Sequence, residues 1–282
     1  MQICVVIPVY NGGKNFYDVL DSYQQKISLP LLVIDDGSDP AVQINKNSSI
    51  HLIRHPKNLG KGKALQTAMQ ECRKLGFTHM LSFDGDGQHI LSEIEKLVDM
   101  AKQHPDAIII GARKFQEDVP GVSQFGRKFS NFWVYYQTQK KVSDTQSGMR
   151  VYPLDKLKGF HFFTGRYDFE IEVLVRAMWK NIEVIDVDVE VFYPKKEERL
   201  SHFHKLKDNA RITFLNILLI AYSLIFYQRS LPKVILAGVA GGILSAVSGV
   251  VLPWLLAVAV SVFLRLNFIL ILVVIACLKL TS

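Results

Sequence analysis

The chain has 282 residues, of which 49% are hydrophobic and 21% charged, with a formal net charge of +7. This length fits one or two domains, and three scattered cysteines without a CxxC pair exclude a disulfide framework and a cysteine zinc site. Because basic residues concentrate directly before an apolar C-terminal stretch, we expect an anionic membrane surface as partner and no nucleic acid. These basic residues are Lys195, Lys196, Arg199, Lys205, Lys207 and Arg211.

Short apolar runs alternate with helical patterns along the N-terminal two thirds of the chain. The first run, residues 3–9, lacks the basic flank and the cleavage site of a signal peptide, so we expect the first strand there, facing the cytosol. Further strands are predicted at residues 31–34, 50–54, 80–83, 107–111, around 150–153 and at 184–193. Helices are predicted around residues 14–23, 64–72, 91–101, 120–141 and 167–179. This alternation predicts an α/β sheet whose polar loops share one crevice at the carboxyl ends of the strands.

Two of these segments have polar or aromatic features that allow two interpretations each. Lys61 and Lys63 stand at a predicted helix start, which favours an anion, although a solvated basic turn is the alternative because the P-loop pattern is missing. The aromatic and basic residues 120–141 fit either an acceptor-side helix near a membrane or an amphipathic core helix.

The fourth predicted strand ends in the sequence DGDGQH, residues 84–89. Two carboxylates one residue apart are not both buried without partners, so Asp84 and Asp86 either stay solvated in a turn or share a divalent cation. The EF-hand pattern is missing. Mg²⁺ or Mn²⁺ fits this pair, because these ions bind a few carboxylates together with substrate phosphates.

Five motifs resemble those of family 2 glycosyltransferases in order and spacing over residues 3–204. They are VVIPVYN at 5–11, VIDDGSD at 33–39, NLGKGKAL at 58–65, FDGDGQH at 83–89 and DTQSGMRVY at 144–152. The chain looks similar to dolichyl-phosphate mannose synthases and bacterial polyprenyl-phosphate glycosyltransferases. The resemblance implies a GT-A nucleotide-diphospho-sugar transferase fold, which is an α/β, Rossmann-like mixed sheet with helices on both faces.

The resemblance also assigns expected roles to individual residues. It implies that Pro8, Tyr10 and Asp36 hold the base and ribose of a UDP- or GDP-sugar. It implies that Asp84, Asp86 and Gln88 hold the metal with its diphosphate. Lys63, Arg113, Arg127 and Arg199 are candidate phosphate contacts, with a solvated surface position as the alternative reading for the arginines. Asn11 and Gly12 depart from the acidic residue that many relatives carry there, which leaves the base contacts less defined.

The acceptor decides whether a general base is needed. A lipid phosphate is already mostly ionised at pH 7, whereas a hydroxyl needs a carboxylate to take its proton. Asp144 is the first candidate for that base or for orienting the acceptor, with a turn former as its alternative, and Glu170 is the second. Glu170 and Glu172 do not share a helix face, so at most one of them faces the crevice. His202 and His204 are weaker phosphate candidates than Arg199.

The C-terminal part reads as membrane material. We expect a catalytic domain in residues 1–204, an amphipathic interfacial helix in 205–230 and two transmembrane helices in 231–282, broken at Pro253. The flanking Arg229, Lys233 and Lys279 place the catalytic domain in the cytoplasm by the positive-inside rule, at a bacterial inner membrane. Arg265 either pairs with a lipid phosphate or another subunit, or snorkels to the interface.

The sequence therefore predicts a membrane-anchored, inverting, metal-dependent hexosyltransferase that acts on a lipid-linked acceptor, in first place a polyprenyl phosphate. The alternatives are transfer to a lipid hydroxyl, a catalytically silent scaffold that binds nucleotide-sugar, and a nucleotidyltransferase, whose basic glycine-rich loop after the first strand is only weakly matched here. A homo-oligomer is compatible with this reading.

Overall fold

The structure is a computed structural model that describes residues 1–45, 49–113, 121–192, 211–216 and 218–219. The chain divides into two compact units, Met1–Ile212 and Thr213–Ser282, and the second is described only at its first residues, which are helical. Within the described residues, no helix is both long enough and apolar enough to cross a bilayer. The predicted transmembrane helices and most of the predicted interfacial helix lie outside the described residues.

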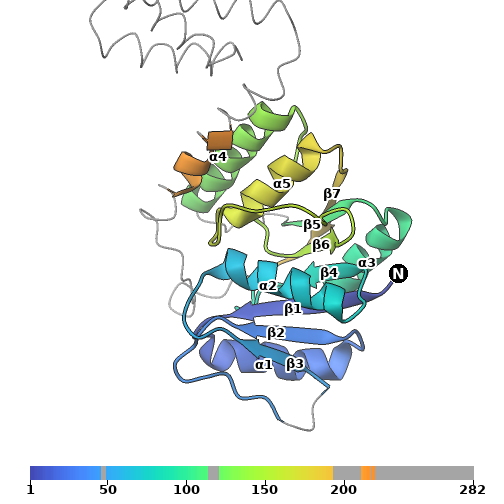
Figure 1. Cartoon of the computed structure of the whole chain (residues 1–282), viewed down its shortest axis with the longest axis vertical. Helices are drawn as coiled ribbons and strands as arrows, with labels where there is room; N and C mark the ends of the chain where they lie inside the picture. Colours follow the sequence, from blue (N-terminus) through green and yellow to red (C-terminus); the bar gives the residue numbers. More distant parts are fainter. Residues whose placement is uncertain (46–48, 114–120, 193–210, 217, 220–282) are drawn as a thin grey trace, which may run out of the picture. The chain divides into compact units, whose positions relative to one another are not determined.

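The first unit is built on one seven-stranded mixed sheet with the strand order β3-β2-β1-β4-β6-β5-β7 (Figure 1). Strand β6 runs antiparallel to both of its neighbours, while the other neighbouring strands are parallel. The strands are β1 (Ile3–Val9), β2 (Leu31–Asp35), β3 (His51–Arg54), β4 (His79–Ser82), β5 (Ile108–Arg113), β6 (Arg150–Pro153) and β7 (Val184–Val189). The predicted mixed sheet is therefore confirmed.

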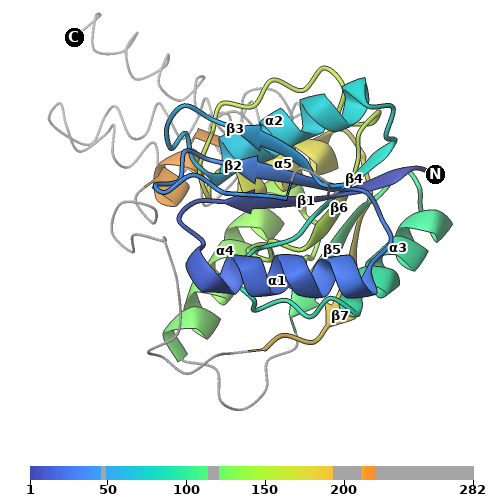
Figure 2. The same cartoon turned by 90° about the horizontal axis from the view of Figure 1, so that it is seen from below.

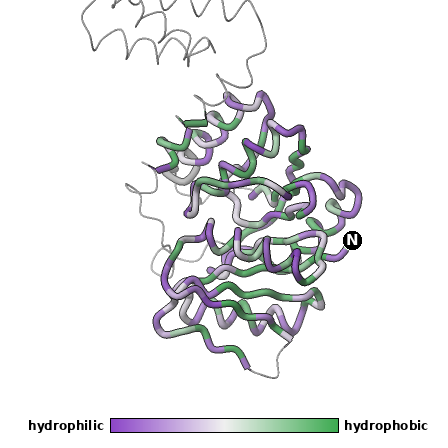
Figure 3. The backbone as a smooth tube through the Cα atoms, viewed as in Figure 1, coloured by the Kyte–Doolittle hydropathy of each residue, from purple (hydrophilic) through white to green (hydrophobic). Residues whose placement is uncertain are grey.

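Helices cover both faces of the sheet, as Figure 2 shows with α2 and α5 on one side and α1 and α3 on the other. The helices are α1 (Gly13–Lys26), α2 (Lys61–Lys74), α3 (Glu93–Gln103), α4 (Gly121–Thr138) and α5 (Phe169–Trp179). Alternation along β1 explains this arrangement, because Val5 and Ile7 belong to the apolar cluster with α1 and α3 while Val6 faces the other side. Hydrophobic residues accordingly run along the central strands in Figure 3.

The element bounds follow the sequence patterns closely. The first strand occupies the predicted residues 3–9, and every predicted helix and strand of the described region is present, although the last strand ends at Val189, before the predicted residue 193. The helix expected from residue 91 begins at Glu93, because Leu91 and Ser92 still form a turn. Strands β1, β2 and β4 are parallel, so the loops that follow them lie at the same edge of the sheet. Because β6 is antiparallel to β4, the loop before β6 lies at this edge as well.

Candidate active site

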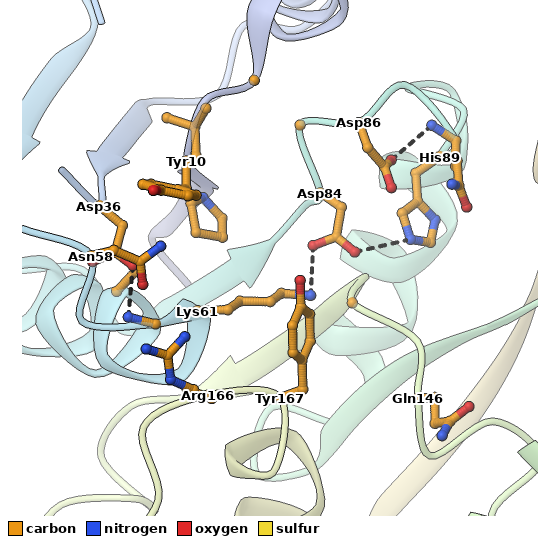
Figure 4. Close-up of a pocket in the computed structure, with 18 of the residues that line it drawn as sticks. Tyr10, Asp36, Asn58, Lys61, Asp84, Asp86, His89, Gln146, Arg166 and Tyr167 are labelled. Atoms are coloured by element: carbon orange, nitrogen blue, oxygen red, sulfur yellow. Dashed lines mark hydrogen bonds and ion pairs between the residues drawn. The ribbon is translucent and has the colours of Figure 1, made fainter. Parts of the chain in front are cut away.

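A cavity of about 550 Å³ lies at this edge of the sheet. Its walls come from the loops after β1, β2, β3 and β4, the start of α2, the end of β5, and the loops before β6 and α5. Figure 4 shows side chains from these segments turned toward one space. The residues that carry polar groups into it include Tyr10, Asp36, Asn58, Lys61, Asp84, Asp86, Gln88, His89, Arg113, Gln146, Arg166 and Tyr167. The predicted shared crevice is therefore present, and its volume is typical of a small-molecule site.

Asp84 is held by a lysine. The Lys61 ammonium lies 2.7 Å from Asp84 Oδ1 and 3.0 Å from Glu170 Oε1 (Figure 4 shows the Asp84 contact). Burial opposes the charge of both partners of the Lys61–Asp84 pair, but their attraction dominates, so the pKa of Asp84 lies below and that of Lys61 above its ordinary value. Asp84 is therefore not simply solvated in a turn, because an ammonium from α2 balances its charge, and its sharing of a divalent cation with Asp86 stays a prediction.

Asp86 lies in a different electrostatic environment two residues further on. Burial, and then the negative charge of Asp84, raise the pKa of Asp86 to about 6. Asp86 Oδ1 accepts a hydrogen bond of 2.9 Å from the backbone N–H of Gln88. The neighbouring His89 is kept neutral at pH 7, since burial lowers its pKa to about 4 despite Asp84 Oδ2 at 3.9 Å from Nε2. A cation beside Asp86 would offset the negative charge of Asp84 and so favour the charged form of Asp86.

The residues of this loop fit a hard divalent cation. Asp84, Asp86 and Gln88 offer carboxylate and carboxamide oxygens, which are the ligands that Mg²⁺ and Mn²⁺ prefer. The described residues contain no cluster of three or more His, Cys, Asp or Glu side chains suited to hold a metal. This small donor set fits an ion that takes its remaining ligands from water or from phosphate oxygens. Gly148 backs the site, because a Cβ there would collide with the Asp84 carboxylate.

Asp36 lines the same cavity, but its carboxylate is mostly occupied by hydrogen bonds from other residues of the chain. Its Oδ1 accepts hydrogen bonds from His55 Nδ1 at 2.7 Å and from the Leu59 backbone at 3.0 Å. Its Oδ2 accepts one of 2.7 Å from the Gly60 backbone N–H. Asp36 therefore fixes the loop that leads into α2 and so positions Lys61. This leaves at most one lone-pair direction, on Oδ2, for the predicted ribose contact.

The segment before α5 contributes Arg166 and Tyr167, which were not predicted as site residues. Its backbone packs against the start of α2, where Lys63 N–H donates to Gly165 O at 2.9 Å. A Cβ on Gly60 or Gly62 would collide with this segment. The two glycines were the sequence signal for this close approach, but nothing in the sequence showed that the partner lies some hundred residues further along the chain.

Glu172 and Arg150 anchor the loops around the cavity. The buried Glu172 carboxylate accepts hydrogen bonds from the backbone N–H groups of Phe163 and Thr164, at 2.9–3.1 Å. The buried Arg150 guanidinium donates to the carbonyl oxygens of Thr145, Ser147 and Glu170, at 2.6–2.8 Å. Both residues bind backbone groups of these loops, and Glu172 also pairs with Arg176 Nη1 at 2.8 Å, so their role is to position the loops. Glu170 turns toward Lys61 while Glu172 does not, as their spacing predicts.

Asp144, the first candidate base, is fully buried in an ion pair. Arg113 Nε lies 2.6 Å from Asp144 Oδ2, and Arg113 Nη2 lies 3.0 Å from Oδ1. Burial opposes ionisation of Asp144, but the Arg113 guanidinium overrides it and holds the pKa of the carboxyl below its ordinary value. Arg127 donates from Nη1 to the Arg113 carbonyl at 3.0 Å. Asp144 is not part of the cavity wall, and its geometry suits orienting Arg113 better than accepting a proton.

The structure thus brings together most, but not all, of the residues singled out in the sequence. Those that line the cavity are Pro8, Tyr10, Asp36, Asp84, Asp86, Gln88 and Arg113. Lys63 does not line the cavity, since its exposed ammonium lies 3.1 Å from Gln66 Oε1. Lys61 lies in the cavity wall, where Lys63 was expected. Glu170 approaches the site through Lys61, and Arg127 through Arg113. Arg199, His202 and His204 lie outside the described residues. The chemical roles predicted for the residues that line the cavity, and for Arg199, His202 and His204, stay predictions.

Known proteins share this sequence pattern. A UDP-N-acetylglucosamine–dolichyl-phosphate N-acetylglucosaminyltransferase of Methanococcus voltae is 25% identical over 215 residues, covering 68% of this chain and 86% of its own. A dolichyl-phosphate beta-glucosyltransferase of Trichomonas vaginalis is 27% identical over 212 residues, covering 66% and 62%. A polyprenol monophosphomannose synthase of Mycolicibacterium smegmatis is 22% identical over 204 residues, covering 66% and 75%.

The fold also has solved counterparts. The glucosyl-3-phosphoglycerate synthase of Mycobacterium tuberculosis, solved with Mn²⁺, UDP and glucosyl-3-phosphoglycerate, superposes with a TM-score of 0.53 over 78% of this chain and 77% of its own. At 16% identity this likeness concerns the fold, and it confirms the predicted GT-A architecture. A sequence profile described as glycosyl transferase family 2 matches residues 4–158, which is more than half of the chain. The chain therefore belongs to glycosyl transferase family 2 and is a glycosyltransferase.

Proposed function

We propose that this protein is a membrane-anchored, inverting hexosyltransferase that moves a sugar from a UDP- or GDP-sugar to a polyprenyl phosphate at the cytoplasmic leaflet. The observation that carries the proposal is the convergence of Asp84, Asp86 and Lys61 in one cavity, beside a wall formed by Pro8 and Tyr10. The wall suits a nucleoside, and the charged groups suit its diphosphate.

The loop after β4, the start of α2 and the segment before α5 supply the donor contacts in this proposal. Asp84, Asp86 and Gln88 would hold Mg²⁺ or Mn²⁺, which when bound stabilises the negative charge that develops on the leaving diphosphate. The start of α2 brings the Lys61 ammonium to the same space, and its positive charge favours an anion. Arg166 and Tyr167 line the same cavity and limit the volume left for the sugar.

The state of the two candidate bases supports a phosphate as acceptor. Asp144 is ion-paired with Arg113 and has a lowered pKa, which makes it a weak base at pH 7. The Glu170 carboxylate is buried against Lys61. An acceptor that arrives ionised, such as a phosphate monoester with a second pKa of about 6, needs neither of them. The named relatives that use dolichyl phosphate support the same choice.

Membrane anchoring rests on the sequence of the C-terminal part. Residues 234–252 and 254–278 are long enough to span a bilayer, and the basic residues 229, 233 and 279 favour a cytoplasmic catalytic domain. Sedimentation of the full chain with membranes after alkaline washing, and cleavage of residues 1–204 by protease only from the cytoplasmic side, would test this part of the proposal.

The acceptor is tested by offering the full-length protein a polyprenyl phosphate and the corresponding polyprenol. A thermal-shift screen of UDP, GDP and their sugars with Mn²⁺ first selects the donor, since a ligand that binds the folded state raises the unfolding temperature. We expect transfer to the phosphate to be at least about 100-fold faster than transfer to the alcohol, because a hydroxyl lacks a general base here. Chiral analysis of the product tests inversion at the anomeric carbon.

The alternatives give different results in the same assay. Transfer to the polyprenol alone would replace the phosphate acceptor by a lipid hydroxyl. Metal-dependent nucleotide binding without turnover of any donor would identify a binding scaffold instead of an active enzyme.

A further inference from the structure

Lys61 joins three elements at the centre of the cavity. It is the first residue of α2, and its ammonium contacts Asp84 in the loop after β4 and Glu170 in the first turn of α5. Its side chain is only 15% exposed, so the contact is made largely away from solvent. Glu170 Oε1 is buried and makes no hydrogen bond of good geometry within the described residues, although it lies 3.0 Å from the ammonium. Lys61 is thus pulled mainly toward Asp84.

An ammonium on Asp84 and a divalent cation on Asp84 oppose each other. Both cations would bind the Asp84 carboxylate oxygens, but Lys61 already contacts Oδ1 and the Gly148 backbone packs closely against the carboxylate. Even if the ion bound the other oxygen, charges of +1 and +2 a few ångströms apart would repel by several kcal/mol at an effective dielectric constant of about 20. Either the Lys61 ammonium or the divalent ion must then bind Asp84 more weakly.

A lysine is suited to give way. Its four-carbon stem has many rotamers and its ammonium keeps its charge in any of them, so it can turn from one anion to another. The space next to it is where the proposed diphosphate would bind, at the start of α2 and beside Arg166. By contrast Lys63, two residues along the same helix, points to solvent and contacts Gln66.

We propose that Lys61 is a built-in counter-cation of Asp84 that competes with the divalent ion, and that the donor diphosphate relieves this competition by giving the ammonium a new anionic partner. The inference rests on the proposed function for the identity of the anion. It has a thermodynamic consequence, which is that the metal binds weakly alone and much more tightly together with the nucleotide. Because such coupling is reciprocal, the metal must strengthen nucleotide binding by the same factor.

The test is the affinity of the full-length protein for Mn²⁺, measured from the free-ion signal in electron paramagnetic resonance, with and without saturating UDP or GDP. Lys61→Met removes the ammonium and keeps the stem, and Lys61→Gln also keeps hydrogen-bond donors for both carboxylates if the first variant folds poorly. Lys63→Met is the matched control, because it removes the same charge from the same helix without touching Asp84.

We expect both Lys61 variants to bind Mn²⁺ alone about tenfold or more tightly than the wild type, because the like charge is gone. The additional gain on adding nucleotide should shrink, whereas Lys63→Met should match the wild type in both measurements. Equal or weaker binding of Mn²⁺ alone by the Lys61 variants would overturn the inference. Equal Mn²⁺ affinity of the wild type with and without nucleotide would also overturn it. A lack of sugar transfer, in contrast, would count against the proposed function and leave the Mn²⁺-only comparison valid.

Discussion

The loop after β2 and the loop after β4 both present an aspartate at the carboxyl edge of the sheet, but they hold it in different ways. Asp36 is bound by two backbone N–H groups and by the His55 ring, all within 3.0 Å. Asp84 is bound by the end of a flexible lysine side chain, and Asp86 follows it with a raised pKa. The backbone contacts of Asp36 are lost only if the loop rearranges, whereas the contacts of Asp84 can be exchanged for a ligand.

This difference indicates that the carboxylates at this edge of the sheet have two roles, one structural and one chemical. Asp36 fixes the loop of residues 57–60, and this loop sets the first residue of α2 and hence the position of the Lys61 ammonium. Asp84 and Asp86 stay available for chemistry because the protein supplies them with few fixed donors. The two loops should therefore respond in opposite ways to mutation, one through stability and the other through activity.

The largest expected effect is the loss of sugar transfer on changing Asp86 to alanine. Removing one of two carboxylates that hold the cation should lower the rate about 1,000-fold or more, because several kcal/mol of transition-state stabilisation are lost. The unfolding temperature without metal should stay equal or rise, since burial and Asp84 disfavour the charged form of Asp86. Transfer assays and thermal unfolding of the same preparation measure both effects.

The control for this variant is Asp18→Ala, which removes an exposed aspartate from α1. It should retain transfer. If Asp86→Ala retained transfer as well, the proposed role of the loop after β4 would be wrong.

The next largest effect is on stability, from Asp36→Ala. This change leaves the Gly60 and Leu59 N–H groups and the His55 ring without their acceptor, and we expect the free energy of unfolding to fall by about 3 kcal/mol. Urea unfolding measures it, with Asp18→Ala expected to stay within about 0.5 kcal/mol of the wild type. A stable Asp36→Ala protein that had lost only nucleotide affinity would instead support the ribose contact suggested by the sequence.

The contrast between these loops also marks how far the sequence could be interpreted. Strand and helix positions, and the crevice at the strand ends, follow from hydrophobic periodicity and from the parallel direction of neighbouring strands. The same periodicity does not say which lysine of the pair at residues 61 and 63 faces the crevice. Residues i and i+2 lie on nearly opposite sides of a helix, so a small uncertainty in the helix start reverses the assignment, and Lys61 proved to be the inward residue.

Partners that are distant in sequence were the second limit. The occupation of Asp36 by N–H groups 23 and 24 residues away, and of Asp144 by Arg113 31 residues away, depends on how loops fold back. No local pattern encodes these pairings, so Asp144 could be predicted as a base or a turn former but not as the ion-pair partner of Arg113. For the same reason the sequence missed Arg166 and Tyr167.

The smallest expected effect is a pH dependence of stability that belongs to Asp86. Its pKa in the folded protein is about 6, above the ordinary value of 3.8, so the folded state binds more protons than the unfolded state between these two values. Without metal, the stabilising contribution of the protonated form is complete below about pH 4 and is lost as the pH rises to about 6.

Asp86→Asn mimics the neutral form of this carboxyl group at every pH. The unfolding temperature of Asp86→Asn minus that of the wild type, measured with EDTA from pH 4 to 7.5, should therefore increase up to about pH 6 and then level off. Groups remote from Asp86 titrate equally in both proteins and cancel from this difference, so a constant value would mean that Asp86 does not have the buried, negatively charged environment that suits a metal ligand.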